Sequence, residues 1–140
     1  MKNLLSLFIC LSLITFSSCG DDDKENGKVK LTAKFTYIHN GETKPSAATE
    51  MVIFKINEST ESWTYNKANN YYTKKDGSVV YPIYTFRADN NGIIEQYIED
   101  NLSYLYVYEP SIDPNVWGID NFTTNGKPVL IEKSHGLSNQ

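Results

Sequence analysis

The sequence is poor in cysteine, histidine and arginine. It has two cysteines, two histidines and, among 13 basic residues, a single arginine, Arg87. Nucleic-acid binding needs clustered Lys and Arg to neutralise phosphates, and the longest basic run here is Lys74-Lys75, so we expect no nucleic-acid partner. A zinc site needs three or four ligands, whereas His39 and His135 are about a hundred positions apart. We therefore predict no metal and no cofactor.

Long hydrophobic runs, helical periods and catalytic motifs are also missing. The stretch from Leu4 to Phe16 holds no charge, but it is too short for a membrane-spanning helix, which needs about 20 residues. No segment carries apolar residues at a 3.6-residue period over three turns, so no long helix is predicted. The sequence contains no nucleophile elbow, phosphate loop or dinucleotide fingerprint. We therefore expect a protein that is not an enzyme.

The N-terminus is typical of an export signal. Lys2 precedes the uncharged stretch, which has the length of a signal-peptide hydrophobic region and ends at Ser17-Ser18-Cys19. Small residues before a cysteine that closes the hydrophobic run resemble the lipobox of bacterial lipoproteins. The resemblance implies that residues 1–18 are a signal peptide and that Cys19 becomes the acylated first residue, anchored firmly in a membrane by two chains. The alternative is an ordinary secretory signal followed by an incidental cysteine.

A short acidic segment follows this cysteine. Gly20-Asp21-Asp22-Asp23-Lys24-Glu25 has four acids in six residues, and we expect residues 19–27 to form a hydrated tether. The segment also resembles the acidic export signal of Bacteroidetes-type lipoproteins. That resemblance implies lipid attachment to the outer membrane with the protein exposed on the cell surface. A periplasm-facing lipoprotein is the alternative.

Residues 28–140 show the pattern of short strands. Apolar residues alternate with polar ones from Val29 to Tyr37, a period of two that predicts a strand with one buried face. Pro82 interrupts the run from Val79 to Phe86, which indicates a bulge or an edge strand. Further strands are predicted over Met51 to Ile56, Ile93 to Ile98, Leu102 to Glu109 and Pro128 to Lys133. We therefore predict one all-β domain, an antiparallel β-sandwich of about seven strands.

The segment from Tyr84 to Tyr108 gives the best-defined series of turns. Phe86-Arg87-Ala88-Asp89-Asn90-Asn91-Gly92 leads through a strand and an acidic turn into Tyr104-Leu105-Tyr106-Val107. This order resembles the transthyretin-like, carboxypeptidase-regulatory-like β-sandwich, where an Asp-x-x-Gly turn, a strand, a Pro-Gly-x-Tyr turn and an apolar strand recur. Here Asn101 stands at the glycine position of the second turn and Ser103 at its tyrosine position. An immunoglobulin-like sandwich is the alternative.

Aromatic residues, in contrast, are abundant: ten Tyr, six Phe and two Trp. Amphipathic rings exposed on a sheet stack against sugars or form interface hot spots. If Leu105 and Val107 face the core, the tyrosines alternating with them form a row on the opposite face, which a tryptophan could extend. The candidate ligand-binding residues are Tyr104, Tyr106, Tyr108, Trp63 and Trp117. In the alternative register the rings are the core, with Leu105 and Val107 outside or under a second sheet.

Together these features predict a lipid-anchored module on the cell surface that has a binding or structural role. Its expected partners are the membrane, through Cys19, and a glycan or a protein. A small hydrolase is the alternative function, because a catalytic site can be assembled from residues far apart in a sequence.

Overall fold

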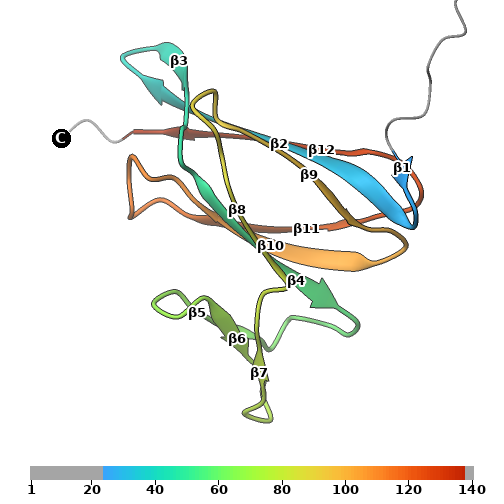
Figure 1. Cartoon of the computed structure of the whole chain (residues 1–140). Coiled ribbons are helices and arrows are strands. Elements are labelled where there is room, and N and C mark those ends of the chain that lie inside the picture. Colours follow the sequence, from blue (N-terminus) through green and yellow to red (C-terminus); the bar gives the residue numbers. More distant parts are fainter. Residues whose placement is uncertain (1–23, 138–140) are drawn as a thin grey trace, which may run out of the picture.

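The computed structural model describes residues 24–137, which form strands in three sheets (Figure 1). None of these residues lies in a helix long and apolar enough to cross a membrane. Sheet A contains β1 (Lys24–Glu25), β2 (Lys28–His39), β3 (Glu42–Pro45), β9 (Ile93–Glu99) and β12 (Val129–Gly136). Sheet B contains β4 (Glu50–Ile56), β8 (Tyr84–Arg87), β10 (Ser103–Glu109) and β11 (Gly118–Thr123). Sheet C contains β5 (Thr64–Asn66), β6 (Tyr71–Thr73) and β7 (Val79–Val80).

Sheets A and B pack face to face, which confirms the predicted all-β sandwich. In sheet A, β2 lies between β12 on one edge and β9 and β3 on the other. Sheet B has the order β11-β10-β4-β8, with every pair antiparallel. The antiparallel expectation is wrong for one pair, since β12 runs parallel to β2. A parallel pair needs a crossover, and here the chain crosses from β11 in sheet B back to sheet A.

The short strands β1 and β3 only extend the pairing of β2. Without them, the two packed sheets contain seven strands. The first, fourth and seventh of these (β2, β9, β12) share sheet A, and the other four share sheet B. In an immunoglobulin domain the first, second, fourth and fifth strands share a sheet. The observed strand order therefore differs from the immunoglobulin-like alternative.

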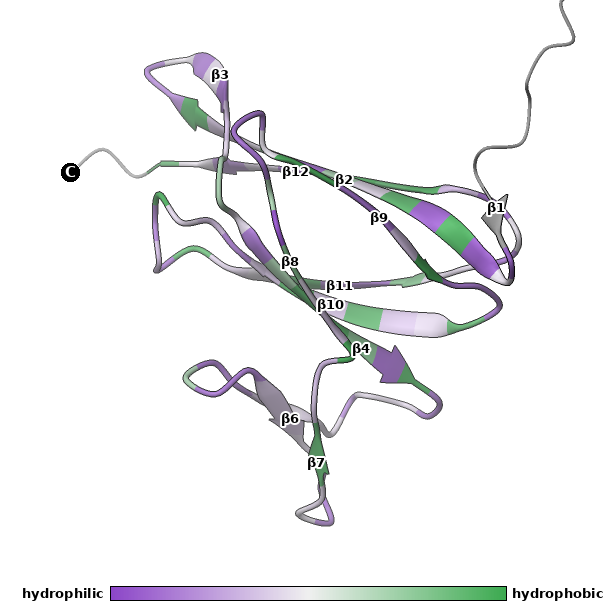
Figure 2. Ribbon diagram, viewed as in Figure 1, coloured by the Kyte–Doolittle hydropathy of each residue, from purple (hydrophilic) through white to green (hydrophobic). Residues whose placement is uncertain are grey.

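The core between sheets A and B explains why apolar and polar residues alternate along β2. The buried side chains of β2 are Val29, Leu31, Ala33 and Phe35. The more exposed residues between them are polar, so hydrophobic and hydrophilic bands alternate along the strand (Figure 2). The buried side chains pack against side chains of sheet B that include Met51, Ile53, Tyr104 and Tyr106. Burying a large apolar side chain contributes about 1.5–3 kcal/mol, so this layer is the main source of stability.

A second apolar cluster lies on the other face of sheet B. It contains Val52 and Phe54 of β4, Leu105 and Val107 of β10, and Tyr72 of sheet C. Sheet C therefore covers the outer face of sheet B as a third layer (Figure 1). It belongs to the segment between β4 and β8, where the predicted strand from Val79 to Phe86 is split into β7 and β8 around Pro82.

Part of the expected tether belongs to the folded domain. β1 pairs with the start of β2 through a turn in which Gly27 has φ of 75°, and the Asp100 N–H donates to the Gly27 carbonyl (2.9 Å). The prediction of a tether is therefore wrong for residues 24–27, because Lys24 and Glu25 pair with β2 and Gly27 is bonded to Asp100. Residues 1–23, with the predicted signal peptide and Cys19, lie outside the described residues.

The predicted turns form where the sequence places them. Gly92 has φ of 74°, and Asp89 Oδ1 accepts hydrogen bonds from two backbone N–H groups of the same turn, those of Asn91 and Ile93. Asn101 has φ of 57°. Asparagine is one of the few residues that adopt this left-handed conformation readily, so it can stand at a turn position that otherwise favours glycine.

We predict that Gly92→Ala destabilises the fold more than Gly41→Ala does. Both glycines have positive φ, which costs about 1–2 kcal/mol for other residues. A Cβ at Gly92 would also lie 2.3 Å from the Phe35 carbonyl oxygen, whereas a Cβ at Gly41 meets no atom within 4 Å. Urea unfolding of the two variants measures the difference. Equal losses of unfolding free energy would contradict the close contact between Gly92 and β2.

Candidate functional site

The predicted row of exposed tyrosines is wrong for Tyr104 and Tyr106. Their exposed fractions are 0% and 2%, because both rings point into the core between sheets A and B. The reversed register holds, with Leu105 and Val107 under sheet C. The Tyr104 hydroxyl donates to the Glu99 carbonyl (2.8 Å), so the buried ring has a hydrogen-bond partner. Burial raises the pKa of both phenols above the usual range, although Lys133 partly opposes this at Tyr106.

The other three candidate rings lie in different parts of the structure and do not form a row. Tyr108 is half-buried, and its ring lies so close to Gly118 that a Cβ there would be 2.4 Å from it. Trp63 is half-buried in the second cluster, 5.8 Å from the Tyr72 ring. Trp117 is 44% exposed. Of the five predicted ligand-binding residues, Trp117 thus keeps the largest open surface.

Trp117 lies beside Tyr65 of sheet C, with 5.9 Å between ring centroids and 36° between ring planes. It follows an Asx turn, in which Asp113 Oδ1 accepts from the Asn115 N–H (3.0 Å) and the Asp113 carbonyl accepts from the Val116 N–H (3.1 Å). This turn shapes the loop before Trp117. Tyr65 then supports the indole from the sheet C side.

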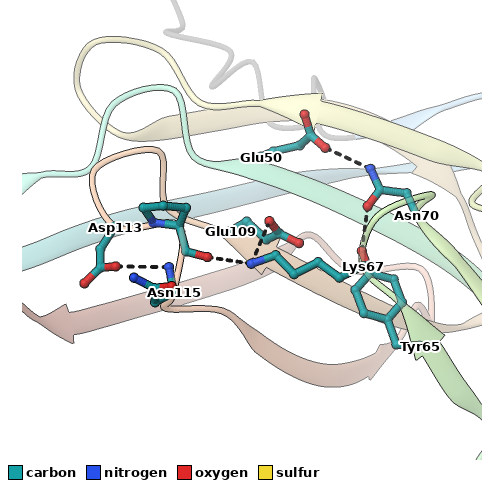
Figure 3. A network of polar contacts seen from close by, with 8 residues as sticks. Glu50, Tyr65, Lys67, Asn70, Glu109, Asp113 and Asn115 are labelled. Atoms are coloured by element: carbon teal, nitrogen blue, oxygen red, sulfur yellow. Dashed lines mark hydrogen bonds and ion pairs between the residues drawn. The ribbon is translucent and has the colours of Figure 1, made fainter.

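A polar network connects sheet C to the ends of β4 and β10 (Figure 3). The Tyr65 hydroxyl donates to Asn70 Oδ1 (2.8 Å), and Asn70 Nδ2 donates to Glu50 Oε1 (3.2 Å). Asn70 has φ of 50°, a conformation that asparagine tolerates in a tight turn. Burial, followed by the charge of Glu109, raises the pKa of Tyr65 above its usual range. The hydroxyl is therefore a stable donor at neutral pH.

Lys67 connects the same turn of sheet C to the loop before Trp117. Its Nζ donates to the Pro114 carbonyl (2.5 Å) and lies 3.3 Å from Glu109 Oε2 (Figure 3). Glu109 is directly opposite Glu50 in the pairing of β10 with β4. Like charges at such a position destabilise a sheet. The ion pair of Lys67 with Glu109 and the hydrogen bond from Asn70 to Glu50 offset this repulsion.

We call this set of side chains the loop-end site. It consists of Glu50, Tyr65, Lys67, Asn70, Glu109 and Trp117. Sequence reasoning identified Trp117 alone. The other five were missed because they come from three separate segments that meet only when sheet C packs on sheet B. The asparagine-rich turn from Asn66 to Asn70 was the available signal, since such turns carry side chains that bond locally.

A groove of about 620 Å³ adjoins the site on the side of β8 and β9. Arg87 lines it and lies 3.8 Å from Glu50, a distance beyond a hydrogen bond. Asp89, Glu95 and Ile93 line the groove as well. Glu50 therefore connects the loop-end site with this groove.

Among residues 24–137 no group of three or more His, Cys, Asp or Glu side chains is arranged to hold a metal ion. The sequence matches no known family, and a search of curated proteins gives no match.

We predict that Tyr65 and Asn70 stabilise the fold as a coupled pair. Tyr65→Phe should lower the free energy of unfolding by about 0.5–1.5 kcal/mol, the usual worth of a hydrogen bond. Asn70→Gly keeps the left-handed backbone and removes the amide, so the double variant should lose less than the two single losses together. Asn70→Ala is the control, with an added backbone cost of about 1 kcal/mol. Strictly additive losses would refute the contact.

Proposed function

We propose that this protein is a lipid-anchored module of the outer cell surface that binds a partner and does not catalyse a reaction. In this proposal Cys19 carries the lipid, and the loop-end site recognises a glycan or a protein. We also infer that the domain is a transthyretin-like sandwich. The strand order, which departs from the immunoglobulin arrangement, supports that inference.

The loop-end site lies at the opposite end of the sandwich from the start of the domain, and this separation supports the proposal. Lys28, at the start of β2, pairs with Glu99, and the chain then turns into β10. Glu109 lies at the far end of β10, about 20 Å away at about 3.3 Å per residue. β1 and the loop between β10 and β11 accordingly lie at opposite ends of the sandwich (Figure 1).

This geometry suits presentation of the site away from a membrane. Five residues, 19–23, separate the proposed lipid on Cys19 from β1, and they can span at most about 18 Å. An anchor there would keep the β1 end of the domain close to the membrane. The loop-end site would then face outward, where a large partner could reach it.

The chemistry of the site favours binding over catalysis. Its carboxylates, Glu50 and Glu109, hold the turn of sheet C through Asn70 and Lys67. Its largest open surface belongs to Trp117, an amphipathic ring of the kind enriched at binding surfaces. Structural carboxylates beside an exposed ring suit recognition of a partner.

We predict that the full chain, expressed in Bacteroidetes-type cells, is recovered from the membrane without residues 1–18 and with lipid on Cys19, as measured by intact mass. Protease added to intact cells should digest it. Cys19→Ala should remove the lipid and release the protein, whereas Cys10→Ala, within the predicted signal peptide, should leave both unchanged. A soluble wild-type chain cut elsewhere would refute the anchor, and a chain protected until the outer membrane is opened would refute surface display.

A further inference from the structure

We propose that the loop-end site binds a neutral oligosaccharide, with a sugar ring stacked on Trp117 and its hydroxyl groups bonded to Lys67 and Glu109. This inference rests on the proposed function of the protein as a binding module. It deepens that proposal by assigning the chemical class of the ligand and the side chains that contact it.

Trp117 is an exposed ring that the fold holds in place. Trp117 is 44% exposed although Tyr65 packs beside it. Apolar surface left in water is unfavourable, and a ligand that covers the indole removes that cost. A pyranose ring presents a flat face of C–H groups, which suits stacking on an aromatic face. The open surface of Trp117 therefore fits a sugar ring.

The loop before Trp117 and the indole itself are preorganised for binding. The loop before Trp117 is fixed by the Asp113 turn and by the bond from Lys67 to the Pro114 carbonyl, which ties it to sheet C. Tyr65 supports the indole and is itself bonded to Asn70. A side chain fixed before binding loses little conformational entropy when the ligand arrives. This favours a contact made by few groups, as in a complex with a short sugar chain.

A pair of polar groups, Lys67 and Glu109, borders the loop that leads to Trp117. Lys67 and Glu109 lie 3.3 Å apart, with 40% and 27% of their side chains exposed. An ammonium group only donates hydrogen bonds and a carboxylate only accepts them. A sugar hydroxyl does both, so neighbouring hydroxyls can satisfy both groups. An apolar protein surface would bury the remaining hydrogen-bonding positions of these two groups without partners, at a cost in binding free energy.

The charges around the loop-end site favour neutral over acidic sugars. Lys67 is paired with Glu109, and Arg87 with Glu50. Asp113, whose carboxylate bonds a backbone N–H of the loop before Trp117, adds a further negative charge. Carboxylates therefore outnumber basic groups around the site. They would repel an acidic glycan, because like charges repel at short range.

The test uses the full chain purified in detergent and electrophoresed through gels that contain one polysaccharide each. The neutral panel is β-glucan, xylan, mannan and galactan, and the acidic panel is polygalacturonate and alginate. We expect retardation by at least one neutral polysaccharide and weaker retardation by both acidic ones. Trp117→Ala should weaken the neutral interaction at least tenfold, and Trp117→Phe should retain most of it. Tyr81→Ala is the control. It removes a ring that is 67% exposed and lies outside the loop-end site, so it should not change polysaccharide binding.

Several results would overturn the inference. They are no retardation by any neutral polysaccharide, stronger retardation by an acidic one, unchanged binding of Trp117→Ala, or equal loss in Tyr81→Ala. Lys67→Met serves as the second variant, because it keeps the indole itself while removing the donor and its bond to the Pro114 carbonyl, and it should weaken binding severalfold. Thermal unfolding checks that each variant is folded. A chain that is lipidated and surface-exposed yet binds no neutral glycan would refute this inference and leave the anchored display intact.

Discussion

Burial of both faces of strands β4 and β10 is the constraint on which the rest of the structure depends. One face of this pair packs on sheet A through side chains such as Tyr104 and Met51, and the other packs on sheet C through Phe54 and Val107. A sheet with one solvated face needs only a single partner layer. Here two layers are needed, so the segment between β4 and β8 must fold back over sheet B.

This third layer also creates the loop-end site. Sheet C brings Tyr65, Lys67 and Asn70 to the ends of β4 and β10, where Glu50 and Glu109 stand opposite each other. The contacts that hold the layer at this end are therefore the contacts that shape the site. Exposed ion pairs contribute little stability singly. The apolar cluster around Tyr72 supplies the main attachment, and the polar groups fix its position.

The sequence predicted most of the sandwich but misassigned the faces of β10. Alternation identified β2 correctly because one of its faces is solvated and carries polar residues. In β10 both sets of side chains are buried, so the contrast between Tyr104 and Leu105 could not tell core from surface. The turns at Gly92 and Asn101 were predictable from local chemistry. Pairings such as Lys67 with Glu109 depend on the placement of sheet C, which periodicity does not encode.

Alkaline titration of phenolate absorbance tests the burial of these rings most directly. Tyr65, Tyr104 and Tyr106 have pKa values raised by burial, and that of Tyr72 rises to about 12. Because the folded pKa exceeds the unfolded value, these groups favour the fold at low pH, and the contribution is lost as pH rises above about 10. We expect these four phenols to ionise only as the protein unfolds. Their ionisation near pH 10 in a folded protein would contradict the burial of the four rings.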